Sequence, residues 1–213
     1  MQLTKFTHAC IRFDDGDRSL VIDPGAFSEV EAALDGADAV LITHEHADHI
    51  DTDKVRAALE RDSRLRLWAP ASVAKNFAEL GEQVTTAEPG QAFDAAGFGV
   101  RTFGGQHAVI HPAIPVISNV GYLIGDAVYH PGDSFFVPPV PIEVLFAPLH
   151  APWSKTSEVI DFVVSVRAPK VTGLHDSLLT STGLNMVRTL VGQFGGQHGS
   201  EFVALAPGET IDA

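Results

Sequence analysis

The chain has 213 residues, with 27 Asp and Glu against 14 Lys and Arg, which gives a formal net charge of -13. A chain of this length can bury one substantial hydrophobic core, so we expect a single domain over residues 1–213. The negative charge disfavours long nucleic acids as partners, because their binding depends on basic residues that neutralise phosphates.

The chain also lacks recognisable membrane and export segments. No stretch approaches the roughly 20 consecutive apolar residues that a membrane span needs, and the first residues have no charged and apolar regions typical of a signal peptide. We therefore expect a cytoplasmic protein without a membrane partner. The single cysteine, Cys10, cannot form an internal disulfide and is interpreted as a small buried strand residue.

The first half of the chain is predicted to begin with short strands and to continue with strand-helix units. Strands are expected at residues 1–7, 9–13, 19–22, 39–42 and 65–69, the first two being either separate or one interrupted strand. Helices are expected at residues 28–34, after a cap at Asp51 or Thr52, and at 71–80, where Gly81 ends the helix.

The second half repeats this pattern. Strands are expected at residues 91–94, 98–103, 119–124, 127–130, 144–147, 170–174 and 201–205, and helices at 156–167 and 180–194. Gly125-Asp126 is a plausible two-residue hairpin turn, and Pro112 and Pro115 predict a mobile loop at 108–118. Two halves of this kind predict two sheets packed face to face with helices outside.

A histidine-rich segment follows the buried strand at 39–42. His44, His46, Asp48 and His49 lie within six residues. In extended backbone His44 and His46 project to the same side, and the other two fall on the following turn. Nitrogen and carboxylate donors in this arrangement suit zinc or a neighbouring first-row metal.

This string, His-x-His-x-Asp-His, resembles the signature of the metallo-β-lactamase-fold hydrolases. Three later segments match the remaining positions of that family: Gly104-Gly105-Gln106-His107, Pro131-Gly132-Asp133 and Gly173-Leu174-His175. The resemblance implies an α+β four-layer αββα sandwich, with two mixed sheets and helices on the outer faces. It also implies two divalent metal ions, one held by His44, His46 and His107, a second by Asp48, His49 and His175, with Asp133 shared. Zn²⁺ is the first choice, and these donors leave Mn²⁺ and Fe²⁺ open.

The resemblance implies a metal-dependent hydrolase. Water between two divalent cations becomes a hydroxide nucleophile near neutral pH, and the net positive centre favours a small, anionic substrate. Thr7-His8-Ala9-Cys10 and the segments around Asp133 and His175 look most like the branch that contains ascorbate-6-phosphate lactonase. A lactone and a phosphodiester stay equally open as the ester-type bond. The alternatives are a non-catalytic metal- or ligand-binding sensor of the same fold and a nuclease, which the charge disfavours.

Several further residues are assigned roles as hypotheses. Asp48 and His150 are the predicted catalytic residues, and His150 could protonate the leaving group. His8, His150 and Trp153 are predicted to contact the substrate. His8 could instead support the ligands or be a structural histidine, His150 could be a pocket-wall residue without a catalytic role, and Trp153 could pack against another subunit of a homo-oligomer. Asp23 and Asp176 could each orient a neighbouring group or cap a turn. Three more histidines are interpreted as structural or loop residues: His111, His130 and His198.

Overall fold

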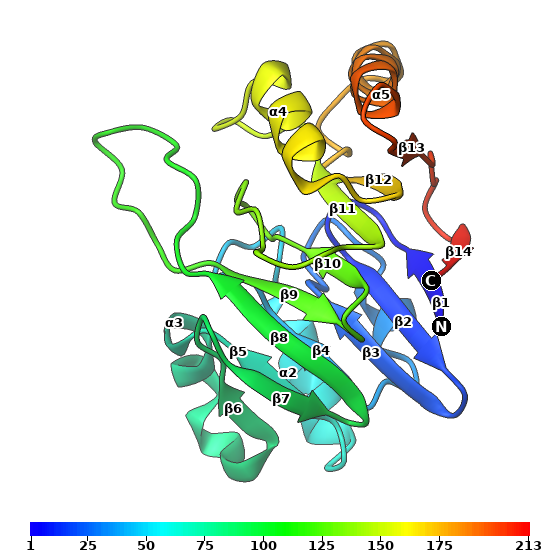
Figure 1. Cartoon of the computed structure of the whole chain (residues 1–213). Helices are drawn as coiled ribbons and strands as arrows, with labels where there is room; N and C mark the ends of the chain where they lie inside the picture. The colour runs from blue at the N-terminus through cyan, green and yellow to red at the C-terminus, as the bar shows by residue number, and fades with distance from the viewer.

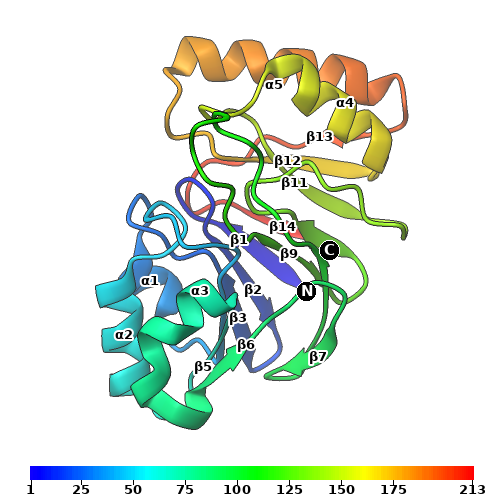
Figure 2. The ribbon, with the colours of Figure 1, turned by 90° about the vertical axis from the view of Figure 1, so that its left-hand side faces the viewer.

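Two seven-stranded sheets face each other in this computed structural model, which describes residues 1–213, and helices lie on their outer faces (Figure 1). The view turned by 90° shows α1, α2 and α3 beside one sheet and α4 and α5 beside the other (Figure 2). The predicted four-layer αββα sandwich is therefore confirmed.

The first sheet has the strand order β14-β1-β2-β3-β4-β5-β6. Its strands are β1 (Gln2–Lys5), β2 (Ile11–Asp15), β3 (Arg18–Ile22), β4 (Ala39–Leu41), β5 (Arg66–Ala69), β6 (Val84–Thr86) and β14 (Thr210–Asp212). The strands β3 to β6 are parallel to one another, whereas β1, β2 and β14 pair in antiparallel fashion. Every residue of β4 is buried, as expected for a parallel strand that is covered on both faces.

The second sheet has the order β13-β12-β11-β10-β9-β8-β7. Its strands are β7 (Ala92–Ala95), β8 (Phe98–Gly104), β9 (Val120–Ile124), β10 (Val128–His130), β11 (Val144–Pro148), β12 (Lys170–Leu174) and β13 (Glu201–Phe202). Gly125 and Asp126 both have positive φ, +60° and +54°, which matches the predicted two-residue hairpin turn between β9 and β10.

The helices are α1 (Val30–Leu34), α2 (Thr52–Arg61), α3 (Ala71–Ala74), α4 (Thr156–Val166) and α5 (Ser181–Gly196). Asp51 caps α2, because its side chain accepts a hydrogen bond from the Lys54 N–H. None of these helices combines the length and the apolar composition needed to cross a bilayer.

Three hydrophobic clusters hold the layers together. One lies between the sheets and includes Phe13, Leu41 and Phe146. The second packs α1 and α2 against the first sheet, and the third packs α4 and α5 against the second sheet. Cys10 belongs to the second cluster, is fully buried and is a free thiol. Burial raises its pKa far above the ordinary value, which fits the expected structural role.

The structure differs from the predicted elements in three ways: one helix is divided, two strands were not expected, and the strand expected at 201–205 spans only Glu201–Phe202. The predicted helix at 71–80 is divided into the single turn α3 and a 3-10 helix at Lys75–Gln83, and within this second segment Phe77 and Gly81 leave helical geometry. Two short strands were also not predicted, β6 and β14. Both are edge strands rich in exposed threonine, so they show no buried apolar alternation.

Candidate metal centre

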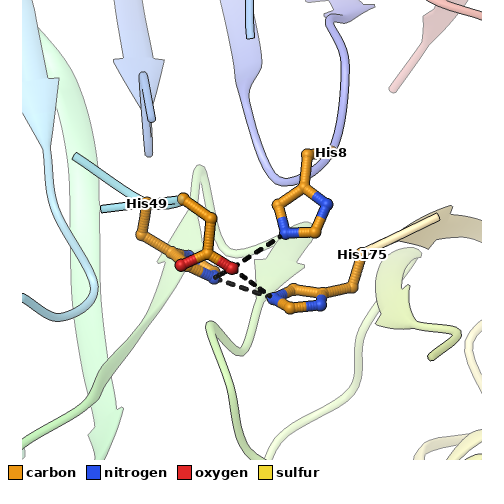
Figure 3. Close-up of side chains that lie close together, drawn as sticks. His8, His49 and His175 are labelled. Carbon is orange, nitrogen blue, oxygen red and sulfur yellow. Dashed lines mark hydrogen bonds and ion pairs between the residues drawn. The ribbon is translucent and has the colours of Figure 1, made fainter. Parts of the chain in front are cut away.

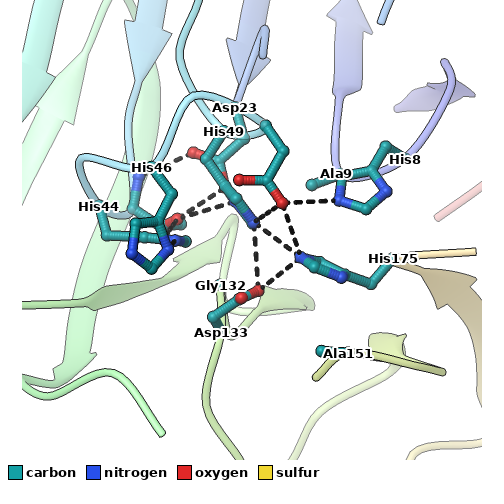
Figure 4. Close-up of polar contacts among 12 residues, drawn as sticks. His8, Ala9, Asp23, His44, His46, His49, Gly132, Asp133, Ala151 and His175 are labelled. Carbon is teal, nitrogen blue, oxygen red and sulfur yellow. Dashed lines mark hydrogen bonds and ion pairs between the residues drawn. The ribbon is translucent and has the colours of Figure 1, made fainter. Parts of the chain in front are cut away.

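Four loops bring the predicted ligands to one edge of the sandwich, and a fifth loop adds His8 (Figure 4). These loops follow β1, β4, β8, β10 and β12, which belong to both sheets. Two groups of four side chains result, and within each group the potential ligand atoms lie within 4.8 Å of one another. The first group is His44, His46, His107 and Asp133, and the second group is His8, Asp48, His49 and His175.

The two sheets are joined directly beside the first ligand. The Tyr122 hydroxyl in β9 donates to the Ile42 carbonyl at 2.9 Å, and the Val120 N–H donates to the Thr43 carbonyl at 2.9 Å. Both acceptors immediately precede His44. Because the hydrogen bonds cross from one sheet to the other, they hold the segment after β4, which carries His44, against β9.

Asp133 is held by a tight turn. Its N–H donates to Asn119 Oδ1 at 2.9 Å, and the Asn119 amide donates to the Pro131 carbonyl at 2.9 Å. Gly132 has φ of +62°, and a Cβ at this position would collide with Asn119 and Thr43. Glycine is therefore required for the Pro-Gly-Asp turn that aims the carboxylate into the site.

The Asp133 carboxylate lies between the two groups. Its Oδ2 is 3.2 Å from His107 Nε2 in the first group. Its Oδ1 is 3.1 Å from His49 Nε2 and 3.0 Å from His175 Nε2 in the second group. One carboxylate therefore faces both groups with different oxygens, which would suit a ligand shared between two metal ions.

Backbone carbonyls fix two ligand histidines. His107 Nδ1 donates to the Ala108 carbonyl at 2.6 Å, and His175 Nδ1 donates to the His150 carbonyl at 3.0 Å. Because a carbonyl can only accept, the proton lies on Nδ1, and the Nε2 atom of each neutral ring presents a lone pair to the site.

Asp23 and Thr43 fix the histidines that follow β4. His49 Nδ1 donates to Asp23 Oδ2 at 2.6 Å, and the same carboxylate accepts from the Thr43 N–H and hydroxyl at 2.7 and 2.6 Å. His44 Nδ1 is 3.0 Å from the Thr43 hydroxyl oxygen. Asp23 therefore orients His49, one of the predicted ligands, and orienting a ligand histidine was one of the two roles considered for Asp23 from the sequence.

The arrangement of donor atoms fits a bound cation. The Nε2 atoms of His49 and His175 are 3.0 Å apart, although two lone pairs cannot form a hydrogen bond with each other. His107 Nε2 and Asp133 Oδ1 are buried without any hydrogen-bond partner. Divalent cations among these atoms would satisfy all four, and imidazole and carboxylate donors suit zinc, manganese or iron.

The charges of the cluster agree with this fit. Burial opposes ionisation of Asp133, but the charge of His49 and the close approach of His107 and His175 hold its pKa well below the ordinary value. Burial likewise opposes a charge on His49, but Asp133 and Asp23 raise its pKa well above the ordinary value. The two carboxylates thus favour a positive charge at His49. A divalent cation near His49 Nε2 would supply that charge in place of a proton.

His8 was predicted to contact the substrate, and the structure places it in the second group (Figure 3). Its side chain is buried, with Nε2 3.1 Å from Asp48 Oδ2 and Nδ1 2.7 Å from the Ser177 hydroxyl. Burial opposes ionisation of Asp48, but the contact with His8 and the nearby His49 and His175 lower its pKa to about 2. Sequence reasoning did not assign His8 as a candidate ligand, because it lies 36 residues before His44.

Two other predicted residues lie beside the cluster. Trp153 Nε1 donates to Asp133 Oδ2 at 2.9 Å, and its ring centroid is 5.9 Å from that of His107. His150 contributes its carbonyl to His175, and its side chain forms no hydrogen bond or ion pair with the two groups. The role of His150 as a proton donor stays a prediction.

The remaining polar residues have structural contacts. His130 Nε2 donates to the Ala9 carbonyl at 2.9 Å, as expected for a structural histidine. Asp176 forms ion pairs with buried Lys5 at 3.1 Å and with Arg188 at 3.2 Å, so it fixes the segment after His175. Two histidines are exposed outside regular helices and strands: His111 and His198.

Comparison with known proteins identifies relatives of this chain. Residues 2–175 match the family described as the beta-lactamase superfamily domain. The chain is 40% identical over 184 residues to Protein Rv0786c of Mycobacterium tuberculosis (strain ATCC 25618 / H37Rv), which covers 84% of this chain and 85% of that protein. It is 31% identical over 154 residues to a UPF0173 metal-dependent hydrolase of Xanthobacter autotrophicus (strain ATCC BAA-1158 / Py2), which covers 63% of this chain and 62% of the relative.

The fold also matches a solved structure, Igni18, a metallo hydrolase from the hyperthermophilic archaeon Ignicoccus hospitalis KIN4/I. The TM-score is 0.76, with 20% identity over 99% of this chain and 97% of that chain. At this identity the likeness concerns the fold. Together with the family match, it shows that the chain belongs to the metallo-β-lactamase superfamily of metal-dependent hydrolases.

Proposed function

We propose that the protein is a hydrolase with a dinuclear metal centre, with zinc as the first choice of metal, that cleaves an ester-type bond in a small molecule. The observation that carries this proposal is the position of Asp133, whose two oxygens face different groups of potential ligands. A site for one ion would need only one of these groups.

The proposed ligands follow the two groups. His44, His46 and His107 hold one ion, and Asp48, His49 and His175 hold the other, with Asp133 between them. Two divalent cations bound there would supply an acidified water as nucleophile and stabilise the oxyanion that forms on the substrate. Two M²⁺ ions and two carboxylates leave a net charge of about +2, which attracts the anionic or carbonyl oxygen of the substrate.

The protein's own residues supply positioning and proton transfer. Asp23 and the carbonyls of Ala108 and His150 hold ligand histidines with the lone pairs directed inward. The Asp48 side chain is 21% exposed, compared with 1% for His49. Asp48 is therefore accessible to water and to a substrate, and we assign it the catalytic role. His150 and Trp153 are proposed to contact the substrate from the rim of the site.

The bond is proposed to be a lactone or a phosphodiester. Hydrolysis of either bond releases an alkoxide that needs a proton, and metal ions held by these residues would stabilise the charge on the substrate oxygen. The resemblance to the ascorbate-6-phosphate lactonase branch supports the lactone, and the positive charge of the centre supports either. Partners are small molecules in this proposal, because the net charge of -13 repels long nucleic acids.

The test is the metal content per chain of protein purified without added metal, combined with a screen of lactones, aryl phosphodiesters and carboxylic esters before and after chelation. We expect about two metals per chain and turnover that chelation abolishes. His198→Ala is the control, because His198 is an exposed histidine outside the site. Two bound metals without turnover of any substrate would favour the sensor, and cleavage of single-stranded RNA would favour the nuclease.

A further inference from the structure

An apolar cavity opens directly beside the first group of ligands. Its volume is about 220 Å³. His46 and His107 form one side, and the rest is lined by the loop between β8 and β9, including Ile110, Ile114 and Val116. Figure 1 shows this loop in green, projecting from the two strands that it connects. A group in the cavity would therefore contact the same histidines that are proposed to hold a metal.

The cavity offers no charged group for recognition. Residues 108–118 contain no Lys, Arg, Asp or Glu, and no Lys or Arg occurs anywhere from Thr102 to Ser154. The lining residues other than the two histidines are all alanine, isoleucine, proline or valine. An anionic or strongly polar substituent would lose its hydration there without gaining a partner.

The loop leaves large apolar side chains in water. Ile114 is 46% exposed and Val116 is 47% exposed, and both line the cavity. Apolar residues that gather beside a polar site often mark the place where a ligand binds. An apolar group in the cavity would cover them, and each methylene that leaves water tightens binding by about fourfold.

We propose that this cavity binds an uncharged apolar group of the substrate, attached to the bond that lies at the metal centre. A cavity of about 150 Å³ can hold a benzene ring, so the available volume suits one aromatic ring or a chain of about six carbons. Ile114 and Val116 determine specificity for this group. The inference rests on the proposed hydrolase and adds the chemistry of one half of its substrate.

The direct test measures binding without turnover. Zinc-incubated protein is titrated by calorimetry with acetate, butyrate and hexanoate, which are the carboxylates that hydrolysis of acyl esters would release. We expect hexanoate to bind at least about tenfold more tightly than acetate, because four additional methylenes enter the cavity. Equal binding of acetate and hexanoate would overturn the inference.

The loop offers a matched pair of valines for mutagenesis. Val116 lines the cavity, whereas Val109 lies on the same loop, is 58% exposed and does not line it. We expect Val116→Ser to reduce the ratio of hexanoate to acetate affinity by at least about threefold, with acetate affinity unchanged. Val109→Ser should leave the ratio unchanged. If the two variants behave alike, Val116 does not determine specificity.

Two further results separate this inference from the proposed function and from subunit contact. Turnover of acetyl and hexanoyl esters at equal kcat/KM would retain the hydrolase and overturn the apolar cavity. Preference for hexanoate without hydrolysis of any ester would retain the cavity and overturn the hydrolase. If Ile114→Ser changes the mass in solution but not the affinity ratio, the loop is an interface between copies of the chain, and the inference is wrong.

Discussion

The two ligand groups differ in what surrounds them. In the first group, His46 is only half-buried and the apolar cavity begins at its ring. In the second group, the three histidines are at most 2% exposed, and the half-buried member is Asp48, whose side chain is 21% exposed. The carboxylate of Asp23 contacts Nδ1 of His49, and the hydroxyl of Ser177 contacts Nδ1 of His8.

We infer from this difference that the two groups have different roles within one site. The first group faces the cavity and can meet a substrate with little rearrangement. The second group is surrounded by side chains that hold its donors in place, as expected for ligands whose geometry must persist through the reaction. Because Asp133 contacts both groups, substitution of Asp133 should weaken metal binding in both. Substitution of a residue that contacts only one group should weaken metal binding mainly in that group.

The largest effect is expected for Asp133→Asn, because this residue faces both groups. An amide cannot act as an anionic ligand on either side, so both metals should be lost or strongly weakened. We expect activity to fall by more than the 10–100-fold that changes in supporting residues typically cause. Metal analysis and turnover measure the effect, and circular dichroism checks the fold. A variant that keeps one metal at full affinity would show that Asp133 belongs to one group only.

A selective loss is expected for His46→Ala. The half-buried position of His46 means that truncation leaves little empty volume, so the protein should stay folded. Metal in the first group should be lost, about one metal per chain should remain, and activity should disappear. The same measurements on His175→Ala should show loss from the second group. An active His46→Ala variant with full metal content would contradict the ligand assignment.

A smaller effect is expected for Asp23→Asn, which alters the contact with His49 but keeps the size of the side chain. The neutral amide no longer stabilises the imidazole as a carboxylate does, so affinity in the second group should fall by about 10–100-fold. Affinity in the first group should fall less, because Asp23 reaches His44 only through Thr43. Stepwise competition with a chelator measures the two affinities. An equal loss of metal affinity in the two groups would show that Asp23 does not act mainly on the second group.

The smallest effect is expected for Ser177→Ala. This change removes one hydrogen bond to His8 Nδ1, and a single neutral hydrogen bond is worth about 0.5–1.5 kcal/mol. Affinity in the second group should therefore fall by roughly two- to tenfold, with no change in the first group. His8→Gln should have at least the same effect, because it changes the side chain that contacts Asp48 directly. An unchanged chelation profile in both variants would exclude His8 from the metal site.

The sequence was most informative where ligands follow a buried strand. The apolar run ending at Ile42 predicts β4, and the spacing of His44, His46, Asp48 and His49 identifies the family signature because these residues are close in the chain. The structure confirms the two-sheet architecture and shows that the later segments with His107, Asp133 and His175 reach the same edge.

The sequence was less informative about elements with few buried apolar residues. The edge strands β6 and β14 expose most of their residues, and they form because neighbouring strands provide hydrogen-bond partners. The 3-10 segment after α3 likewise has non-helical backbone at Phe77 and Gly81. Hydrophobic periodicity detects elements that bury one face, and these segments bury too few residues for such a pattern to appear.

The sequence by itself determined the fold family and the chemical class of the site, because both depend on residue types at short spacing and on their order along the chain. Tertiary structure alone decided how the donors are grouped and what lies beside them. It brought His8 to Asp48, directed the Asp23 carboxylate to His49, and placed the apolar loop against His46. These contacts join residues from separate loops, whose mutual distances are set by the packing of two sheets rather than by any local pattern.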